Sequence, residues 1–433
     1  MELQSALTLF GVFGLLMVIG VPIAFAIGIA AVLTFMLFMT FDQSVYITAQ
    51  QMASGLDSFT LLAIPFFILA GNIMNRGGIA LRLIEFAKVL GGRLPGSLAH
   101  CNVLANMMFG SISGSAVASA AAVGGVMAPM QKKEGYDPAY SAAVNISSCP
   151  TGLLIPPSTT FIVYSLITNG TSIAALFVAG YIPGLLMGLG IMAIAGVIAR
   201  KRGYPVSPRP SWREVVHKTA DALLPLGLIV VVMGGIIGGV FTATEASAVA
   251  VVYTLFLALV WYREIGLKDL PAIILESAVT TSIVLLMIGC SIAMSKVMAF
   301  ADIPYTISDA LLAVSDNPLV LFLVINIALL VVGTFMDMTP ALLIFTPIFL
   351  PVVQDLGMDP VHFGVMMTFN LSIGICTPPV GSALFVGCSV AKVSIGNVLR
   401  PLLPFYAVLV VLLLAVTYIP ALSLTLPRLV LGY

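Results

Sequence analysis

The sequence predicts an all-α membrane protein that crosses the bilayer many times, and three observations support this fold class. Of the 433 residues, 60% are hydrophobic and only 8% are charged, whereas soluble domains carry about 25% charged residues. The charges are clustered, and most stretches between the clusters reach the roughly 20 apolar residues that a helix needs to cross a membrane. Two of these stretches also contain a doubled proline at matching positions. The stretches without Asp, Glu, Lys or Arg are 3–41, 94–131, 138–199, 222–244, 338–354, 360–391 and 401–427.

Composition also excludes several classes of protein. A soluble enzyme or a nucleic-acid-binding protein would need a polar surface, and a β-barrel would alternate apolar and polar residues over about ten positions. The net charge is zero and the five cysteines lie in apolar stretches without C-x-x-C spacing, so we expect buried thiols. An intramembrane serine hydrolase would need a base near Ser113, but His100 lies thirteen residues away, about 20 Å along a helix. We therefore expect no enzymatic activity.

The order of apolar and mixed stretches predicts the helices. The start of the chain has no basic region and no small-residue cleavage signature, so we expect a retained first helix rather than a signal peptide. Apolar helices are expected at about 5–38, 58–75, 97–129, 173–199, 220–241, 246–262, 272–295, 318–332, 338–352 and 402–420, and shorter helices with scattered charge at 44–56, 79–91 and 303–314.

A basic linker at 200–218 divides the chain into two parts of similar size. It holds six of the eighteen basic residues, namely Arg200, Lys201, Arg202, Arg209, Arg213 and Lys218. Because basic loops stay on the cytoplasmic side, we expect a cytoplasmic linker. The other parts that we expect are an N-terminal scaffold helix with an interfacial segment at 1–57, a first repeat at 58–199, central scaffold and linking helices at 219–300, and a second repeat at 301–433.

The doubled prolines belong to an internal repeat. When the chain is aligned with itself at a spacing of 222 residues, Pro156-Pro157 meets Pro378-Pro379, and Asp137 meets Asp359, without a gap. Nine of 45 positions are identical, and seven of these are Gly, Pro or Asp, which determine backbone shape. Interrupted helices in matching positions of two halves indicate the binding site of a transporter.

Each copy is expected to form a re-entrant hairpin, at about 137–169 and about 359–392. In the first copy, only about 11 residues separate Ser158 from the turn expected at Asn169-Gly170. At 1.5 Å per residue this second arm spans about 17 Å, roughly half of the bilayer core. A segment that enters the membrane and returns fits this length better than two crossings.

The doubled prolines are also expected to free backbone carbonyl groups inside the membrane. Proline has no N–H, so the carbonyls of Gly152 and Leu153, and those of Gly374 and Ile375, lose their helical partners. Na⁺ is a suitable partner because it is a hard cation that takes oxygen ligands. Two similar cation sites follow, and Thr377 adds a hydroxyl group to the second. The second arms begin with free N–H groups, which suit an anion such as a carboxylate.

Small and polar residues precede each doubled proline. At the same spacing of 222 residues, Ser111 pairs with Gly333, and Ser115 pairs with Asp337. Close helix packing and oxygen ligation of a cation both explain the serines. Asp337 is a functional candidate because it is the lone acid of an apolar stretch. For Glu245, a functional role and a water-exposed turn remain equally open.

These motifs resemble the large membrane subunit of tripartite ATP-independent periplasmic (TRAP) transporters over essentially the whole chain. The set of motifs is specific because of its order and spacing along the chain. The motifs are Leu61-Leu62-Ala63-Ile64-Pro65-Phe66-Phe67, Gly110-Ser111-Ile112-Ser113-Gly114-Ser115, the two Pro-Pro tips and Phe241-Thr242-Ala243-Thr244-Glu245-Ala246. The resemblance implies an elevator-type transporter with two inverted repeats, each carrying a re-entrant hairpin, and with scaffold helices. It also implies Na⁺-driven uptake of an organic anion through a bacterial inner membrane.

The resemblance implies partners and site residues as well. The partners would be a small four-helix membrane subunit and a periplasmic substrate-binding protein, with no nucleic acid and no organic cofactor. The substrate would lie between the tips, near Ser113, Ser158, Asp337 and Thr339. One Na⁺ site would use Ser111, Ser115, Gly152, Ile155 and Pro156, and the other would use Gly333, Gly374, Thr377 and Val380, mostly through backbone oxygens.

One position leaves the substrate class open. Many relatives of the sialic-acid type have Asp where this chain has Ser119. This difference argues against sialic acid specifically, although sialic acids stay within the expected substrate class. C4-dicarboxylates, sugar acids and small sulfonates remain open. The alternative function is an autonomous citrate-type ion-coupled carrier or channel, which would need no binding protein.

Overall fold

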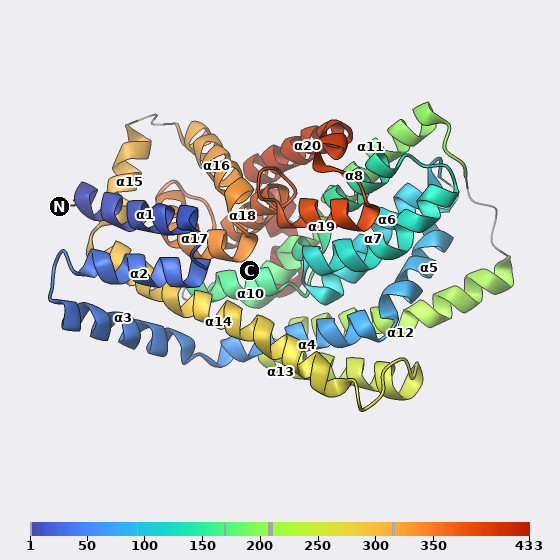
Figure 1. Ribbon diagram of the computed structural model, residues 1–433, viewed down its shortest axis with the longest axis horizontal. Helices are drawn as coiled ribbons and strands as arrows, with labels where there is room; N and C mark the ends of the chain where they lie inside the picture. Colours follow the sequence, from blue (N-terminus) through green and yellow to red (C-terminus); the bar gives the residue numbers. More distant parts are fainter. Residues whose placement is uncertain (1, 93, 169, 207–210, 314, 316) are drawn as a thin grey trace.

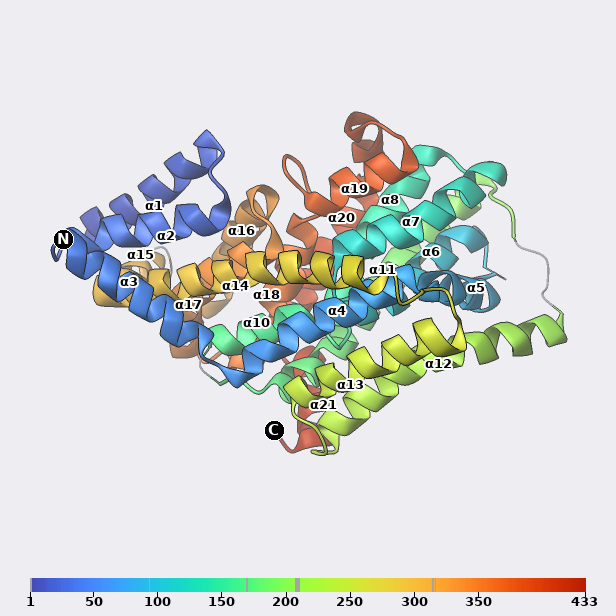
Figure 2. The same ribbon diagram turned by 60° about the horizontal axis from the view of Figure 1, so that its bottom comes forward.

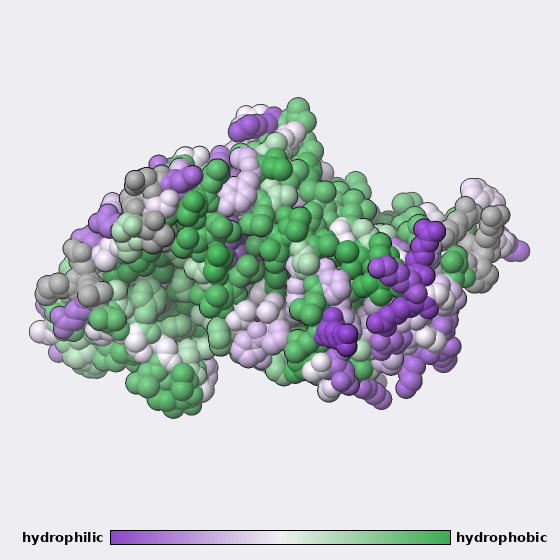
Figure 3. Space-filling model, turned by 90° about the horizontal axis from the view of Figure 1, so that it is seen from above, coloured by the Kyte–Doolittle hydropathy of each residue, from purple (hydrophilic) through white to green (hydrophobic). Residues whose placement is uncertain are grey.

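Helices make up all the regular secondary structure that the computed structural model describes, which covers residues 2–92, 94–168, 170–206, 211–313, 315 and 317–433. Asn169 and Arg209, which were used above, lie outside the described residues. Eight helices in the described part are long and apolar enough to cross a membrane, or nine if a bent pair counts as one crossing. A broad hydrophobic surface covers the middle of the face seen in Figure 3, as expected for contact with lipid.

One group of helices, which we call the framework, comes from the start and the middle of the chain. Its long members α3, α4, α12, α13 and α14 form the lower layer in Figure 1 and lie together again in Figure 2. The framework comprises α1 (Glu2–Ile19), α2 (Ile23–Phe35), α3 (Phe41–Leu56), η1 (Phe59–Leu62), α4 (Ala63–Arg76), α5 (Ile79–Gly91), α12 (Trp212–Ile237), α13 (Ala243–Leu255), the π-helical turn η2 (Phe256–Trp261), α14 (Leu270–Phe300) and α15 (Ile303–Leu312).

Two matched groups of helices, the repeat units, lie above the long framework helices in Figure 1, to the right of α1, α2 and α15. The first contains α6 (Ser97–Ser113), α7 (Ala116–Lys133), α8 (Pro138–Ser148), α9 (Thr151–Leu154), α10 (Thr159–Ile167) and α11 (Ile173–Arg202). The second contains α16 (Pro318–Phe335), α17 (Met338–Asp355), α18 (Pro360–Gly374), α19 (Ser382–Ala391) and α20 (Ile395–Tyr418), followed by α21 (Ala421–Leu431).

Helix caps confirm the spacing of 222 residues between the repeat units. Asp137 is the N-cap of α8, and its partner Asp359 is the N-cap of α18. Their carboxylates accept hydrogen bonds from the second residue of each helix, at 2.9 and 2.8 Å. Ser172 and Ser394 likewise begin α11 and α20. The same residue types therefore start the same elements in both copies.

Two helices that were expected to be continuous are pairs of helices. The stretch 5–38 is broken between α1 and α2, where Gly20 has a φ of 89° and Pro22 follows. The stretch 97–129 is broken between α6 and α7, where Gly114 has a φ of 63°. A residue in the left-handed region ends a helix, and glycine adopts it without strain.

The chain folds back on itself before each doubled proline. The open end of the first hairpin is closed by the Gln131 side-chain amide on α7, which donates to the Leu98 carbonyl on α6 at 3.2 Å. In the second repeat unit, Leu319 at the start of α16 and Gln354 near the end of α17 line one pocket. Each repeat unit thus contains a helical hairpin, α6–α7 and α16–α17.

The first doubled proline bends a helix without reversing it. The axis turns by 51° between Pro138–Leu154 and Thr159–Ile167, where we expected the second arm to return. Ile155 has the extended conformation that a following proline favours, with φ −83° and ψ 120°. Nothing in a doubled proline requires a reversal, and packing against the other repeat unit decides the direction of the second arm.

The second arms cross between the repeat units. Helix α10 packs against α17, and α19 packs against α7 and α8. The Tyr164 hydroxyl on α10 donates to the Pro360 carbonyl at 2.6 Å, and the Cys376 thiol donates to the Ile146 carbonyl at 3.0 Å. The start of α18 therefore lies beside the far end of α10, so the two broken helices enter from opposite sides. This arrangement supports an inverted repeat.

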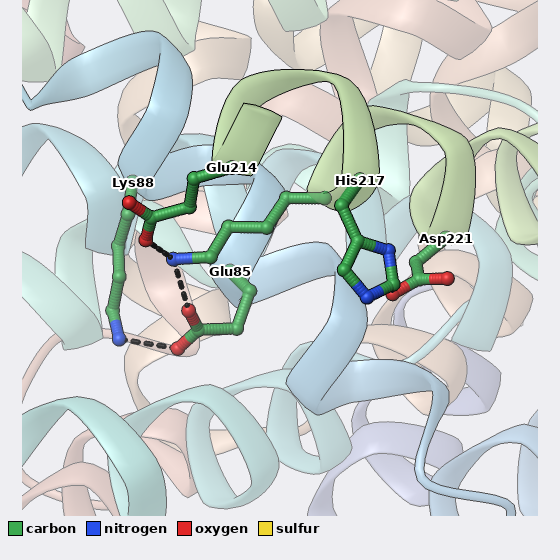
Figure 4. A network of polar contacts seen from close by, with 6 residues as sticks. Glu85, Lys88, Glu214, His217 and Asp221 are labelled. Atoms are coloured by element: carbon green, nitrogen blue, oxygen red, sulfur yellow. Dashed lines mark hydrogen bonds and ion pairs between the residues drawn. The ribbon is translucent and has the colours of Figure 1, made fainter. Parts of the chain in front are cut away.

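An ion-pair cluster joins the framework helix α12 to α5, which leads into the first hairpin (Figure 4). The Lys218 ammonium lies 2.9 Å from a Glu85 oxygen and 2.6 Å from a Glu214 oxygen, and Lys88 also pairs with Glu85. Burial disfavours the Glu85 carboxylate, but hydrogen bonds from the two lysines outweigh burial and hold the pKa of Glu85 below its usual value.

Replacing Glu85 with Gln should lower the melting temperature at neutral pH, because two ammonium groups lose their partner. The loss is about 1 kcal/mol or less, as for partly exposed ion pairs. Since the folded pKa is depressed, this stabilisation is complete above about pH 4.5 and is lost as the pH falls through the lowered pKa. Melting curves at pH 7 and pH 4 measure both effects. Equal shifts for Glu85→Gln and for Glu134→Gln, a control outside the cluster, would contradict this prediction.

Candidate functional site

The tip region of each hairpin touches the broken helix of its own repeat unit at a pair of glycines. A Cβ added to Gly152 would lie 2.2 Å from the Gly110 carbonyl carbon. A Cβ added to Gly374 would lie 2.6 Å from the Gly333 Cα. The two backbones are therefore in direct contact at both places, which only glycine permits. The first turn before each doubled proline is held against a hairpin.

The carbonyl groups that were expected to be free are mostly paired. The Leu153 carbonyl accepts the Ser158 hydroxyl at 2.6 Å. The Gly374 carbonyl accepts the Thr377 N–H at 2.9 Å, and the Ile375 carbonyl accepts the Ala383 N–H at 3.1 Å. Within the described residues, only the carbonyl of Gly152 among these four has no hydrogen bond. Local turns thus restore most of the bonds that the prolines remove, and each paired carbonyl keeps a second lone pair.

The residues assigned to the first cation site lie around one contact. Gly152 packs against the backbone N of Ser111, and Ser115 is the N-cap of α7, where its hydroxyl oxygen accepts the Ala118 N–H at 3.2 Å. Ile155, which precedes Pro156, also contacts α11 at Gly184. The structure therefore places Ser111 beside Gly152, and Ile155 beside α11.

The residues assigned to the second cation site form a matching cluster. Gly333 touches Gly374, and the Val380 N–H donates to the Thr334 carbonyl at 3.1 Å. The Thr377 hydroxyl donates to the Ile373 carbonyl at 2.8 Å. No group of three His, Cys, Asp or Glu in the described residues could hold a metal ion, so carbonyl and hydroxyl oxygens are the available ligands.

The four residues assigned to the substrate differ in how accessible they are. Asp337 is exposed at the tip of the second hairpin, is the N-cap of α17 and accepts the Ser382 hydroxyl at 3.0 Å. Ser113 and Thr339 are half-buried beside the two hairpin turns. Ser158 is fully buried and its hydroxyl is used by Leu153, so the structure does not present it to a ligand.

Two threonines that sequence analysis did not single out connect these tips. The Thr159 hydroxyl donates to the Gly114 carbonyl at 3.2 Å, which ties the start of α10 to the first hairpin turn. The Thr160 hydroxyl lies 3.5 Å from the Met338 sulfur at the second hairpin turn. The start of α10 thus contacts both hairpins, and Ser158-Thr159-Thr160 was the available sequence signal.

Buried amide networks, also missed, fasten each hairpin to its broken helix. The Asn106 amide on α6 donates to Asn145 at 3.0 Å and to Ser148 at 2.8 Å, and the Ser119 hydroxyl donates to the Asn106 oxygen at 2.7 Å. Ser119 therefore belongs to this network.

In the second repeat unit, the Asn370 amide on α18 donates to the carbonyl and side-chain oxygens of Asn326 on α16, both at 2.9 Å. The sequence signal for both networks is asparagine in charge-free stretches.

Glu245 has a structural role. Its carboxylate accepts the Thr242 N–H at 2.8 Å in a capping box at the start of α13. This geometry favours the exposed turn over a binding role.

The family model described as "Tripartite ATP-independent periplasmic transporter, DctM component" matches residues 10–422. The chain belongs to this family. Like other TRAP permeases it is a multi-pass protein of the inner membrane and a transporter component rather than an enzyme. The predicted family and fold class are confirmed.

Several relatives match this TRAP permease over nearly their whole length. YgiK of Salmonella typhimurium is 57% identical and covers 98% of this chain and 97% of its own. The sialic acid TRAP transporter large permease protein SiaM of Vibrio cholerae is 41% identical, over 98% of this chain and 99% of its own. The C4-dicarboxylate TRAP transporter large permease protein DctM of Pseudomonas aeruginosa is 42% identical, over 93% of this chain and 94% of its own. Among solved structures, the YdaH transporter of Alcanivorax borkumensis has a similar fold, with a TM-score of 0.61 at 12% identity over 92% of this chain and 90% of that chain.

Gly152→Ala should separate the first hairpin of this TRAP permease from the break. The added methyl group would lie 2.2–2.6 Å from backbone atoms of Gly110 and Ser111, and overpacking of this kind costs about 1–3 kcal/mol. Thermal unfolding of the purified protein measures the loss. Gly125→Ala is the matched control, because nothing lies within 4 Å of its added Cβ. Equal melting temperatures for the two variants would contradict the close contact.

Proposed function

We propose that this TRAP permease imports a small organic anion by coupling its movement to Na⁺. A periplasmic binding protein would deliver the anion, and a small four-helix membrane subunit would complete the transporter. The observation that carries the proposal is the pair of matched contacts between a hairpin and a proline break, at Gly110–Gly152 and Gly333–Gly374. Relatives named for sialic acid and for C4-dicarboxylates support a substrate that carries carboxylates. Carboxylates, including sugar acids, and sulfonates are the substrate class.

Oxygen atoms at the two breaks suit Na⁺. The Gly152 carbonyl offers an unused acceptor, and the Gly374 and Ile375 carbonyls each accept one bond and keep one lone pair. The Thr377 hydroxyl adds a side-chain oxygen to the second site. Na⁺ at these positions would compensate the backbone groups that the prolines leave without helical partners. We therefore propose at least two Na⁺ ions.

The anion would lie between the hairpin turns. Helices α10 and α19 begin there, and their N-terminal N–H groups and positive dipole ends favour a negative ligand. Ser113 and Thr339 offer hydroxyl groups beside the turns, and Asp337 would accept hydrogen bonds from substrate hydroxyls. These groups provide selectivity without a fixed positive charge at the tips.

An elevator movement is consistent with how the repeat units pack. Because α10 packs on α17 and α19 packs on α7, each repeat unit holds the other, and the two would move as one body. The framework would remain fixed while this body carries its sites across the membrane. Small sliding of packed elements is a common form of such transitions.

Uptake into proteoliposomes tests the proposal. With the small subunit and a loaded binding protein present, an inward Na⁺ gradient should drive uptake, because cation binding at the breaks favours the anion-bound state. Replacing all Na⁺ with K⁺ should reduce uptake to the level of protein-free vesicles. Uptake that survives this replacement would reject Na⁺ coupling. Full uptake by the single chain, without soluble partner, would instead support the autonomous citrate-type carrier.

Thr377→Val should weaken the second Na⁺ site. Loss of one oxygen ligand should raise the Na⁺ concentration for half-maximal uptake about tenfold, equivalent to about 1.4 kcal/mol. Thr280→Val is the matched control, since both threonine hydroxyls donate to a carbonyl four residues earlier but Thr280 lies on the framework helix α14. The Na⁺ dependence of uptake measures the difference, and a shift of the same size in the control would refute a ligand role for Thr377.

A further inference from the structure

A crevice of about 990 Å³ lies between the framework and the repeat units, away from both proline breaks. One wall comes from α3, η1, α14 and the turn between α12 and α13, all in the framework. The other wall comes from the end of α10, the start of α11 and one residue of α17, Leu343. The walls thus belong to the two parts that we propose to move against each other.

The crevice opens on the side opposite the basic linker. Helix α11 runs from the crevice at Ile173 to Arg202 beside the linker, over 30 residues, and α12 runs from Trp212 to the crevice over 26 residues. At 1.5 Å per residue these lengths are about 45 and 39 Å, enough to cross the membrane. With the linker cytoplasmic, the crevice faces the periplasm.

The side chains that line the crevice suit an anion. Lys296 on α14 is exposed and is the one charged residue among the described lining residues. It forms no ion pair with any residue that the structure describes. The first turn of α11 adds N–H groups without helical partners. Hydroxyl groups make up most of the remaining polar lining: Ser54, Ser58, Thr60, Ser165, Thr171, Ser172, Thr242, Thr244, Ser291 and Ser295.

One of these hydroxyls has no partner. Ser291 lies five residues before Lys296 on α14, is 3% exposed and lines the crevice. Its hydroxyl makes no hydrogen bond within the described residues. A buried polar group without a partner is costly unless a ligand or water satisfies it, so this hydroxyl is available to donate a hydrogen bond to a ligand in the crevice.

We propose that this crevice is a second binding site for the transported anion, at which Lys296 pairs with its carboxylate or sulfonate and Ser291 donates a hydrogen bond to it. The identity of the ligand rests on the proposed function, whereas the crevice, its charge and its unpaired hydroxyl do not. The crevice lies on the periplasmic route to the hairpin turns: Ser165 is seven residues after Ser158 on α10, about 10 Å along the helix. An anion released by the binding protein would rest here before it enters the central site.

A fluorescent reporter tests binding directly. The five native cysteines are buried, so Ser54→Cys, at an exposed lining position on α3, can be labelled selectively in the complex with the small subunit in nanodiscs. Sodium succinate, sodium N-acetylneuraminate, sodium isethionate and sodium chloride are titrated at constant ionic strength. We expect a saturable change with at least one organic anion. No change with any of them, or the same change with chloride, would overturn the proposal.

Substitutions of the lining residues distinguish a specific binding site from nonspecific attraction by a positive charge. Lys296→Gln should weaken binding at the reporter about tenfold or more, as expected for loss of a charge-assisted hydrogen bond, and Lys296→Arg should preserve it. Ser291→Ala should weaken binding with no loss of thermal stability, since no protein partner is lost. Lys268→Gln, an exposed lysine outside the crevice, is the control. Equal effects of Lys268→Gln and Lys296→Gln would reject the site.

Uptake separates this proposal from the proposed function. In Lys296→Gln we expect a higher half-saturating concentration of loaded binding protein and an unchanged dependence on Na⁺. Unchanged uptake kinetics together with normal Na⁺ coupling would reject the crevice as a transport site and leave the proposed function intact. Absence of Na⁺-driven uptake in the wild type would reject the proposed function, while saturable binding at the reporter would still stand.

Discussion

Backbone groups inside a membrane must be paired within the protein, and the architecture of this TRAP permease follows from how it meets that requirement at two doubled prolines. Each doubled proline removes two helical bonds. A hydroxyl group and nearby N–H groups restore three of the four, at Leu153, Gly374 and Ile375. Of these four carbonyls, only that of Gly152 has no hydrogen bond within the described residues. The contacts at Gly110–Gly152 and Gly333–Gly374 hold a hairpin against the turn before each doubled proline. Protein covers the first break completely, whereas Pro379 and Val380 at the second break are exposed.

Each broken helix is stabilised by packing against the other repeat unit, and this packing joins the two repeat units. A broken helix cannot support itself through its break, because its two halves share no hydrogen-bond ladder there. Here each second arm is supported by the other repeat unit, α10 by α17 and α19 by α7 and α8. The amide networks around Asn106 and Asn326 fasten the hairpins to the first arms. A cation bound at either break, as proposed above, would act on contacts that both repeat units share, and this would give a physical basis for coupling between the two sites.

Sequence analysis found the repeat and its spacing, because Asp137, Asp359 and the doubled prolines act through local backbone chemistry. Sequence analysis placed the hairpins at the doubled prolines, whereas the structure has them just before, at α6–α7 and α16–α17. The length of α10 fits both an arm that returns and an arm that continues after a bend, and only tertiary packing distinguishes the two. The break at Gly114 was missed because Gly114 did not indicate the end of a helix more strongly than other glycines in the sequence. The family resemblance assigned Ser158 to the substrate. The sequence could not show that its hydroxyl is already used, because the buried bond to Leu153 depends on how the chain turns after Pro157. Crevices between distant segments have no sequence signature.

On the two proposals above, the scarcity of charge would order the events at the two anion sites. The carboxylate of Asp337 at the second hairpin turn would disfavour an arriving carboxylate, whereas Lys296 in the crevice would attract one. A Na⁺ bound at the second break, beside Gly333, would offset the charge of Asp337 and lower the barrier to anion entry. The crevice would then concentrate the substrate while the central site admits it only with the cation, and coupling would need no further charged residue at the tips.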